Sequence, residues 1–381
     1  MTALRRRPGR AALGALALGS LVTSACGTVN SAGPGAATTT TESPATTAYA
    51  IPAGAASKAL VIDTLGGGRS EAYLVDAAAG RTLGAIGFGY SDPASPIAMT
   101  ADATRAYVCT RDPAKGFQTA VIQLNLSNFT AAAPIALGAQ TFNLACAGIA
   151  AYSPGHLLAE VGNTLVEVAT ATAGHRIVAR LPGTQAGRMS FDGPAGTAYI
   201  PRQVGITLEL LPFNASNDTL GAPITLGSLA PSEMAGIVFS GSGRAWALVV
   251  RSGSVSGSWI VPVLTAAHRA GNPIALPPTQ IPTSLTGSGG SLYLLAYPGP
   301  LQAPAIYSIQ PPGSTPKELV KLPATWAVDL KSAAGRLVVS MGTSSVSAAI
   351  GLVGPAAPSG LTSLPLPMAA QAGPGPIAVP G

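Results

Sequence analysis

The chain has 381 residues, of which 21 are Lys or Arg and 15 are Asp or Glu, so its formal net charge is +6. Charged residues make up only 9% of the chain, against about 25% in ordinary soluble domains, which excludes a nucleic-acid-binding protein with a broad basic surface and a charge-rich disordered protein. The 46 Gly and 34 Pro residues place turns at short intervals and disfavour long helices, while the 47% of hydrophobic residues suffice for a large core.

The N-terminus has the pattern of an export signal. Four arginines lie within the first ten residues, no acidic residue precedes Glu42, and an uncharged apolar stretch covers residues 11–25. This stretch is too short to span a bilayer, which needs about 20 residues. If residues 1–25 are removed as a signal peptide, 17 basic and 15 acidic residues remain and the net charge falls to +2. The positive charge therefore indicates export rather than an acidic partner.

The signal segment ends in VTSAC at residues 22–26, which resembles a bacterial lipobox. In such a box, small residues precede a cysteine that is diacylated and becomes the new N-terminus. Thr23 departs from this pattern, which usually has a large aliphatic residue at that position. The resemblance implies lipidation of Cys26 and a location on the outer side of the bacterial cytoplasmic membrane or in the cell envelope. An ordinary signal peptide with an incidental cysteine is the alternative.

Residues 26–57 are rich in Thr, Ala, Gly and Pro and show no apolar periodicity. Such a segment cannot bury enough surface to offset its loss of chain entropy on folding, so we expect a flexible tether. A tether that follows a lipidated cysteine would hold the next domain clear of the membrane.

The remainder of the chain is built from a repeat. An apolar stretch, a small-residue turn and a second apolar stretch recur at intervals of 40 to 52 residues, followed by one or two further β-like runs. Four short strands in about 45 residues is the spacing of a β-propeller blade. The repeats begin at Ile97, Ile149, Met189, Ile237, Thr283 and Val328.

The two ends of the repeat region complete one another. Residues 58–64 match the second strand of a unit, and residues 376–381 match the first strand of another unit that then stops. Pairing the two ends would remove two unpaired sheet edges. We therefore predict an all-β, seven-bladed propeller of four-stranded blades over residues 58–381, closed by the C-terminal strand. An all-β sandwich is the alternative, but it does not predict an evenly recurring unit.

The repeats resemble those of bacterial seven-bladed propellers of the YVTN type, including surface-layer and YncE-like proteins. Residues 97–109 and 189–200 carry the resemblance best, and Asp102 and Asp192 hold the acidic position of the turn. The other repeats are degenerate in this turn. The resemblance implies the fold and leaves the activity open, because propellers host many unrelated functions.

Cys109 and Cys146 remain as a pair if Cys26 carries lipid. The repeat pattern places Cys109 at the close of a second strand and Cys146 just before the first strand of the next unit, on the same face of neighbouring blades. In an exported protein this arrangement predicts a disulfide. Two buried free thiols are the alternative. Nothing in the sequence places an activating base beside either cysteine, so a catalytic thiol is not supported.

Loops on the same face as the predicted disulfide carry charged residues that could contact a ligand, since propellers commonly bind ligands where loops converge at the channel mouth. Solvated surface charges are the alternative interpretation and the more frequent one. The residues in question are Asp92, Arg111, Asp112, Lys115, Arg202, Glu233 and Arg251.

The sequence shows no motif for a metal or another cofactor, and we expect none. His156, His175 and His268 lie in different units without the paired spacing of metal ligands, and we found no nucleophile elbow or phosphate-binding loop. We therefore expect a monomeric, lipid-anchored binding or scaffolding module that contacts an envelope protein or a cell-wall ligand. A lactonase-like or other hydrolase with its site at the channel mouth is the first alternative, and a dehydrogenase-like propeller is the second.

Overall fold

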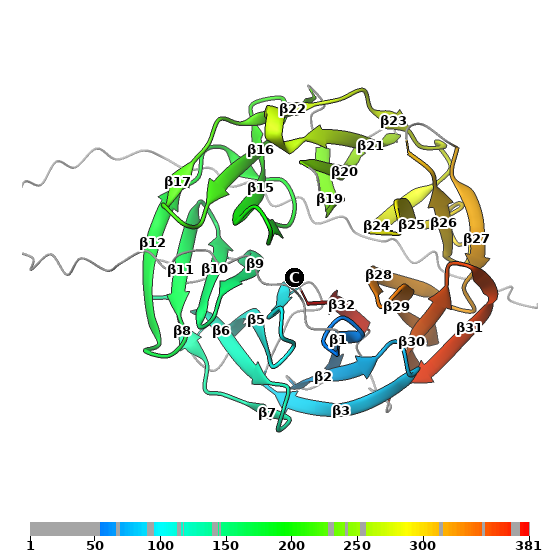
Figure 1. Cartoon of the computed structure of the whole chain (residues 1–381), viewed down its shortest axis with the longest axis horizontal. Coiled ribbons are helices and arrows are strands. Elements are labelled where there is room, and N and C mark those ends of the chain that lie inside the picture. Colours follow the sequence, from blue (N-terminus) through cyan, green and yellow to red (C-terminus); the bar gives the residue numbers. More distant parts are fainter. Residues whose placement is uncertain are drawn as a thin grey trace, which may run out of the picture. The chain divides into compact units, whose positions relative to one another are not determined.

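The computed structural model confirms the predicted all-β architecture, a ring of seven antiparallel blades (Figure 1). The predicted signal peptide, Cys26 and residues 26–53 of the predicted tether lie outside the described residues. Residues 54–57 form a turn that leads into the first strand. The described residues are 54–65, 69–89, 95–112, 116, 118–138, 144, 146–227, 232–240, 243–251, 257–311, 315–344, 347–366 and 374–380.

Blades 2, 5 and 6 are four-stranded meanders in which each strand pairs with the next, from the inner strand at the central channel to the outer strand at the rim. Blade 2 consists of β9 (Cys146–Ser153), β10 (His156–Val161), β11 (Thr164–Ala169) and β12 (Gly174–Arg180). Blade 5 consists of β24 (Ile281–Ser288), β25 (Ser291–Tyr297), β26 (Ala305–Ile309) and β27 (Lys317–Lys321). Blade 6 consists of β28 (Trp326–Ala333), β29 (Arg336–Ser344), β30 (Ser347–Gly354) and β31 (Ala357–Pro365).

In blades 1, 3 and 4 the outer strand is divided into two short pieces that both pair with the third strand. In each of these blades a proline directly precedes the second piece of the outer strand, and a proline has no backbone N–H for the hydrogen bonds between strands. These residues are Pro134, Pro223 and Pro273. Blade 1 consists of β4 (Ile97–Met99), β5 (Arg105–Asp112), β6 (Gln118–Asn125), β7 (Thr130–Ala131) and β8 (Ile135–Ala136). Blade 3 consists of β13 (Thr184–Gln185), β14 (Ser190–Asp192), β15 (Thr197–Val204), β16 (Thr207–Asn214), β17 (Thr219–Leu220) and β18 (Ile224–Gly227). Blade 4 consists of β19 (Ser232–Phe239), β20 (Arg244–Arg251), β21 (Gly257–Leu264), the 3₁₀ turn η3 (Thr265–Ala267), β22 (Arg269–Ala270) and β23 (Ile274–Ala275).

Blade 7 is assembled from both ends of the repeat region, as the sequence predicted. The inner strand β32 (Pro374–Ala378) pairs with β1 (Lys58–Leu65), with Ile377 opposite Val61. The strands β2 (Arg69–Asp76) and β3 (Arg81–Phe88) complete the sheet in the order β3-β2-β1-β32. This pairing closes the ring without leaving the edge of β1 unpaired.

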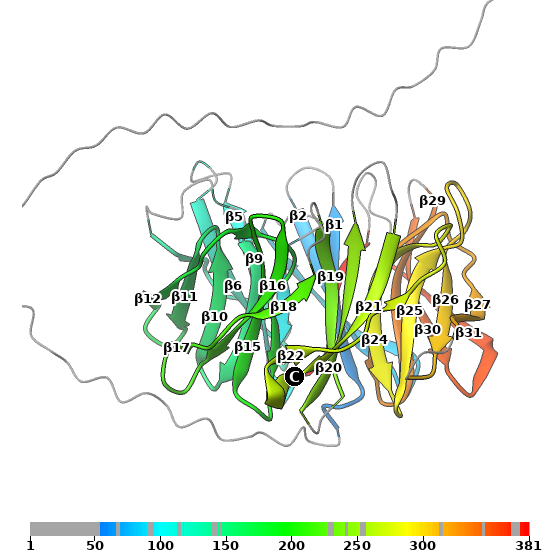
Figure 2. The same ribbon diagram turned by 90° about the horizontal axis from the view of Figure 1, so that it is seen from above.

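The core of the ring lies between neighbouring blades, because both faces of each blade are apolar. In β2, Ala72 and Leu74 pack towards blade 1, while the alternate residues Tyr73 and Val75 pack towards blade 6. Seven such clusters of described residues fill the seven interfaces between blades. This period-2 alternation, buried on both sides, holds the blades upright around the channel (Figure 2).

The ring has two ends, which we name by their connections. The disulfide face is the end at which the second strand of a blade ends and the third begins, as β5 and β6 do in blade 1. The turn face carries the turns that join the first and second strands, at residues 100–104 in blade 1, 154–155 in blade 2 and 193–196 in blade 3.

Candidate functional site

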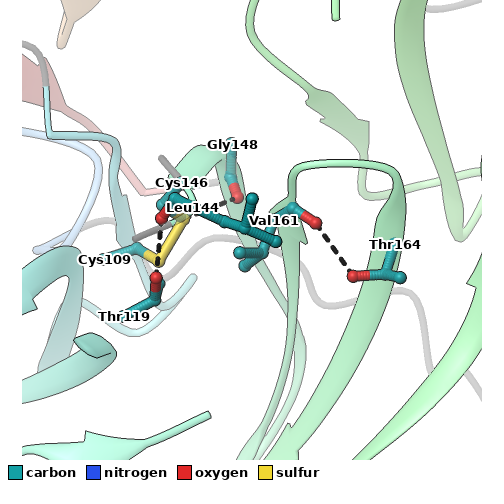
Figure 3. Close-up of a disulfide and its surroundings, with 7 residues drawn as sticks. All are labelled: Cys109, Thr119, Leu144, Cys146, Gly148, Val161 and Thr164. Atoms are coloured by element: carbon teal, nitrogen blue, oxygen red, sulfur yellow. Dashed lines mark hydrogen bonds between the residues drawn. A yellow bond between two sulfur atoms is a disulfide. The ribbon is translucent and has the colours of Figure 1, made fainter. Parts of the chain in front are cut away.

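Cys109 and Cys146 form the predicted disulfide between blades 1 and 2 (Figure 3). The two sulfur atoms are 2.12 Å apart, and the two Cα atoms are 6.0 Å apart. Beside the bond, the hydroxyl of Thr119 donates a hydrogen bond of 2.6 Å to the carbonyl oxygen of Leu144. The second strand of blade 1 is thus tied covalently to the inner strand of blade 2.

Those charged residues predicted for the disulfide face whose side chains the structure describes do not gather in one place. Arg111 is half-buried near the end of β5 in blade 1 and has a polar partner. Glu233 is exposed in β19 and Arg251 is half-buried at the end of β20, so both belong to blade 4, three blades away. Asp92, Lys115 and the side chain of Asp112 lie outside the described residues.

The prediction that Arg202 lies in a loop and contacts a ligand is wrong. It lies inside β15, and its side chain is fully buried between blades 2 and 3. Its guanidinium donates to Oε1 of Glu160 at 3.0 Å and to Oδ1 of Asn163 at 2.6 Å. The other three N–H groups donate to carbonyl oxygens, so all five donors are used. Arg202 is therefore a structural clamp between two blades. The three carbonyl groups are those of Gly162, Pro182 and Gly183.

The turn face holds a pocket of about 330 Å³ where the inner turns of blades 1, 2 and 3 meet. Its apolar lining includes the side chains of Tyr107, Tyr152 and Phe191, together with Pro154 and Pro194. A mostly apolar concavity with a few polar groups is the usual form of a small-molecule site. We name this concavity the turn-face pocket.

Local turn chemistry shapes the rim of the turn-face pocket. In blade 1, Oδ1 of Asp102 accepts hydrogen bonds from the hydroxyl of Thr100 at 2.6 Å and from the backbone N–H of Thr104 at 3.0 Å. In blade 2 the turn uses Gly155, whose φ of 76° lies in the left-handed region that glycine adopts without strain. Asp102 was visible in the sequence as a mark of the repeat, but not as part of the rim of a site.

Two buried hydroxyl groups in the lining of the pocket lack a hydrogen-bond partner in the described part of the chain. They belong to Tyr107, which is 1% exposed, and to Ser153. Tyr107 comes from the second strand of blade 1 and Ser153 from the end of the inner strand of blade 2. Leaving a buried hydroxyl unpaired costs about 1–3 kcal/mol, so a ligand that pairs with it would recover that free energy.

Tyr152 is held in place as a wall of the pocket. Its hydroxyl donates to Oε1 of Glu167, and its ring lies 6.3 Å from the ring of Phe191, centroid to centroid. Burial, the hydrogen bond to Glu167 and the charge of Glu167 raise the pKa of Tyr152 above its usual range. Tyr152 therefore stays neutral, and its only O–H donor is already used.

Glu167 is the centre of a polar network that joins blades 2 and 3 behind this wall. It accepts from Tyr152, from Nδ1 of His156 at 3.1 Å and from Arg176, and Arg176 also pairs with Asp218 of blade 3 at 2.7 Å. Burial alone raises the pKa of Glu167, but the hydrogen bond from Tyr152 and the charge of Arg176 bring it below its usual range. Glu167 is thus an ionised anchor.

A neighbouring depression of about 460 Å³ lies between blades 3 and 4 and includes His268 in its lining. None of the buried, unpartnered polar atoms of the described residues belongs to this lining. The turn-face pocket is therefore the better candidate for a ligand site.

Among the residues that the structure describes, no group of three or more His, Cys, Asp or Glu side chains could hold a metal ion. Over the same residues, we found no helix with the length and apolar character needed to cross a membrane.

Comparison with known proteins identifies the fold. No protein-family profile and no curated protein matches the sequence. A puromycin-hydrolysing peptidase of Mycobacterium tuberculosis matches with a TM-score of 0.53 and 14% identity, over 85% of this chain and 54% of that one. A prolyl endopeptidase structure matches with a TM-score of 0.53 and 11% identity, over 83% of this chain and 50% of that one. The chain thus spans about half the length of these two proteins, and the likeness establishes a β-propeller rather than an activity.

Proposed function

We propose that this protein is an exported, lipid-anchored propeller that binds a small molecule at the bacterial cell envelope as a non-catalytic module. The turn-face pocket carries this proposal. It combines three aromatic rings with the buried hydroxyls of Tyr107 and Ser153, which have no partner within the described residues. A ligand with hydrogen-bonding groups that reach both hydroxyls would pair them and recover the free energy that their burial costs.

Export and anchoring are proposed from the sequence. The arginine-rich start, the apolar stretch at residues 11–25, Cys26 and the tether that follows support a lipoprotein. The turn sequences of the repeats support kinship with the YVTN and YncE-like propellers. We further propose a monomer that contacts the membrane through its lipid and an envelope protein or a cell-wall component through its propeller, without binding nucleic acid.

Ligand-observed NMR with a library of small soluble fragments tests the binding function on the purified full-length protein. Ala101→Trp places an indole at the turn-face pocket, and Ala266→Trp places the same group at the neighbouring depression as a matched control. We expect Ala101→Trp to abolish saturation transfer to the fragments and Ala266→Trp to preserve it. Equal transfer to all three proteins would refute the proposed binding site.

Membrane fractionation tests the anchor. We expect the wild-type protein to partition into the detergent phase and Cys26→Ala to appear in the aqueous phase. A Cys26→Ala protein that remains membrane-bound would exclude lipid anchoring at this residue.

A hydrolase is the second candidate, and one contact favours it. Nδ1 of His156 lies 3.1 Å from Oε1 of Glu167, which is the way a carboxylate orients a catalytic histidine. Ser153 lies opposite His156 in the pairing of β9 with β10. Activation of a serine requires a hydrogen bond from its hydroxyl to the base. Oγ of Ser153 has no partner in the described residues, so the geometry favours a binding protein over a hydrolase. If a fluorophosphonate labels the wild-type protein but not Ser153→Ala or His156→Gln, the hydrolase becomes the favoured function.

A further inference from the structure

We infer that the turn-face pocket takes a small ring-bearing carboxylate. This inference rests on the proposed binding function and adds the chemical class of the ligand. Three features of the lining point to it: two hydroxyl groups without a described partner, an arginine whose guanidinium has no described partner, and a wall of aromatic rings.

The hydroxyls define the polar end of the ligand. Tyr107 and Ser153 both line the pocket, and within the described chain neither buried hydroxyl has a hydrogen-bond partner. A carboxylate only accepts hydrogen bonds, and its two oxygens can accept from both hydroxyls at once. Hydrogen bonds to an ionised acceptor are also about twice as strong as those between neutral groups.

Arg105 supplies the charge. It lines the pocket at the first position of β5, and its guanidinium has no ion pair or hydrogen bond with the described residues. Arg202 and Arg176, by contrast, are paired with carboxylates elsewhere in the ring. An exposed guanidinium in the lining of the same pocket suits a carboxylate, which it can bind with two parallel N–H bonds.

Asp102 also lines the pocket, and its charge opposes a carboxylate. Its oxygens already accept hydrogen bonds from the hydroxyls of Thr100 and Thr104 and from the backbone N–H of Thr104. Asp102 therefore serves the turn rather than a cationic ligand. Its repulsion should still weaken carboxylate binding, so Asp102→Asn should strengthen it, because the asparagine oxygen can keep accepting in the turn.

The rings define the apolar end of the ligand. Tyr152 is fixed by its hydrogen bond to Glu167 and packs against Phe191, which leaves a rigid aromatic surface facing a volume of about 330 Å³. Rigid aromatic surfaces favour offset or edge-to-face contact with another ring. A short aliphatic acid such as acetate would leave this surface uncovered.

The test uses three probes on the purified full-length protein: 2-naphthoate, the neutral isostere 2-naphthamide, and acetate. We expect 2-naphthoate to bind at least tenfold more tightly than either of the others. Arg105→Gln should remove about tenfold of the affinity for 2-naphthoate and leave 2-naphthamide unchanged. Tyr107→Phe should weaken 2-naphthoate several-fold, and Asp102→Asn should strengthen it. Arg244→Gln, the exposed first residue of the equivalent strand in blade 4, is the matched control and should change nothing.

Three other results would overturn the inference, and they show whether the proposed binding function fails with it. Binding of 2-naphthamide as tight as that of 2-naphthoate, blocked by Ala101→Trp, would overturn the carboxylate assignment and leave the pocket as a binding site. Binding of neither probe, together with no effect of Ala101→Trp on any fragment, would overturn both. A preference for 2-naphthoate that survives Arg105→Gln and Tyr107→Phe would place the carboxylate elsewhere and overturn the inference.

Discussion

Oδ2 of Asp329 in β28 accepts a hydrogen bond of 2.9 Å from the backbone N–H of Ile377 in the closing strand β32. Its other oxygen, Oδ1, accepts a hydrogen bond of 2.7 Å from the hydroxyl of Ser284 in β24. One carboxylate thus links the inner strands of blades 5, 6 and 7. It also pairs an edge N–H of the strand that closes the ring, a group that would otherwise cost free energy if buried without a partner.

Removal of this carboxylate should weaken the closure of the ring. Asp329→Ala leaves the N–H of Ile377 without its acceptor and removes the 2.7 Å acceptor of the Ser284 hydroxyl, so we expect the free energy of unfolding to fall by about 3 kcal/mol. Hydrogen exchange at residues 374–380 should accelerate more than exchange in blade 2. Lys331→Ala, which removes a half-exposed cation 3.8 Å from the carboxylate, is the control and should cost less than about 1 kcal/mol. Uniform acceleration over all blades would contradict a local role in closure.

A second prediction concerns the buried pair of Arg202 and Glu160. Breaking a buried ion pair by removing one partner leaves an unpaired charge, which costs about 3–5 kcal/mol. Arg202→Met should therefore lower the free energy of unfolding by this amount in urea titrations. The double variant Arg202→Met with Glu160→Leu should recover most of the loss, because it removes the stranded carboxylate. Arg251→Met, a half-buried arginine at the end of β20, is the control.

A double variant as unstable as Arg202→Met alone would show that shape rather than charge dominates at this site. Glu160 already carries the cost of burial, which raises its pKa to about 7 despite the charge of Arg202. Its Oε2 has no hydrogen-bond partner in the described part of the chain.

Asp63 in β1 makes the stability of the protein depend on pH. It is fully buried, lies opposite Glu71 in the pairing of β1 with β2, and neither of its oxygens has a partner among the described residues. Burial and then the charge of Glu71 raise the pKa of Asp63 from 3.8 to about 6. Between these values the native protein holds a proton that the unfolded chain releases, so stability falls as pH rises through this window.

Asp63→Asn should remove this component of the pH profile. We expect wild-type stability to fall by about 1–2 kcal/mol relative to Asp63→Asn between pH 4 and pH 7, in urea titrations at several pH values. Glu318→Gln replaces an exposed carboxyl group on β27 and serves as the control that should retain the wild-type profile. Parallel profiles for wild-type and Asp63→Asn would contradict the prediction.

The fold could be predicted from the sequence because its signals are local and recur. Each repeat carries the same apolar run, turn and apolar run, and the incomplete units at the two ends fit together as β32 and β1. Cys109 and Cys146 could be paired for the same reason, since the repeat fixes where each lies in its blade.

The pocket could not be predicted because it depends on contacts between repeats. Tyr107 stands in an ordinary strand sequence, and only the packing of blades 1 and 2 leaves its hydroxyl unpaired. Arg202 was misplaced because β15 continues to Val204, past the apolar run at residues 198–200 by which the sequence marks the strand. Its partner Glu160 comes from the preceding repeat, which no spacing rule within one repeat could identify.

The disulfide connects the two strands that supply the pocket hydroxyls. Cys109 and Tyr107 lie on β5, and Cys146 and Ser153 lie on β9. With a sequence separation of 37 residues, the bond should stabilise the protein by about 4 kcal/mol through the entropy of the unfolded chain. The double variant Cys109→Ser with Cys146→Ser should therefore lower the urea midpoint.

The same double variant should weaken probe binding at the turn-face pocket several-fold, because β5 and β9 lose their covalent register. A matched control is the wild-type protein in a reductant strong enough to open the bond, confirmed by alkylation of two thiols. Reduced wild-type and the double variant should then agree in both stability and affinity for 2-naphthoate. If the double variant loses stability but keeps full affinity, the van der Waals packing between blades 1 and 2 sets the spacing of the two hydroxyls, and the disulfide contributes to stability alone.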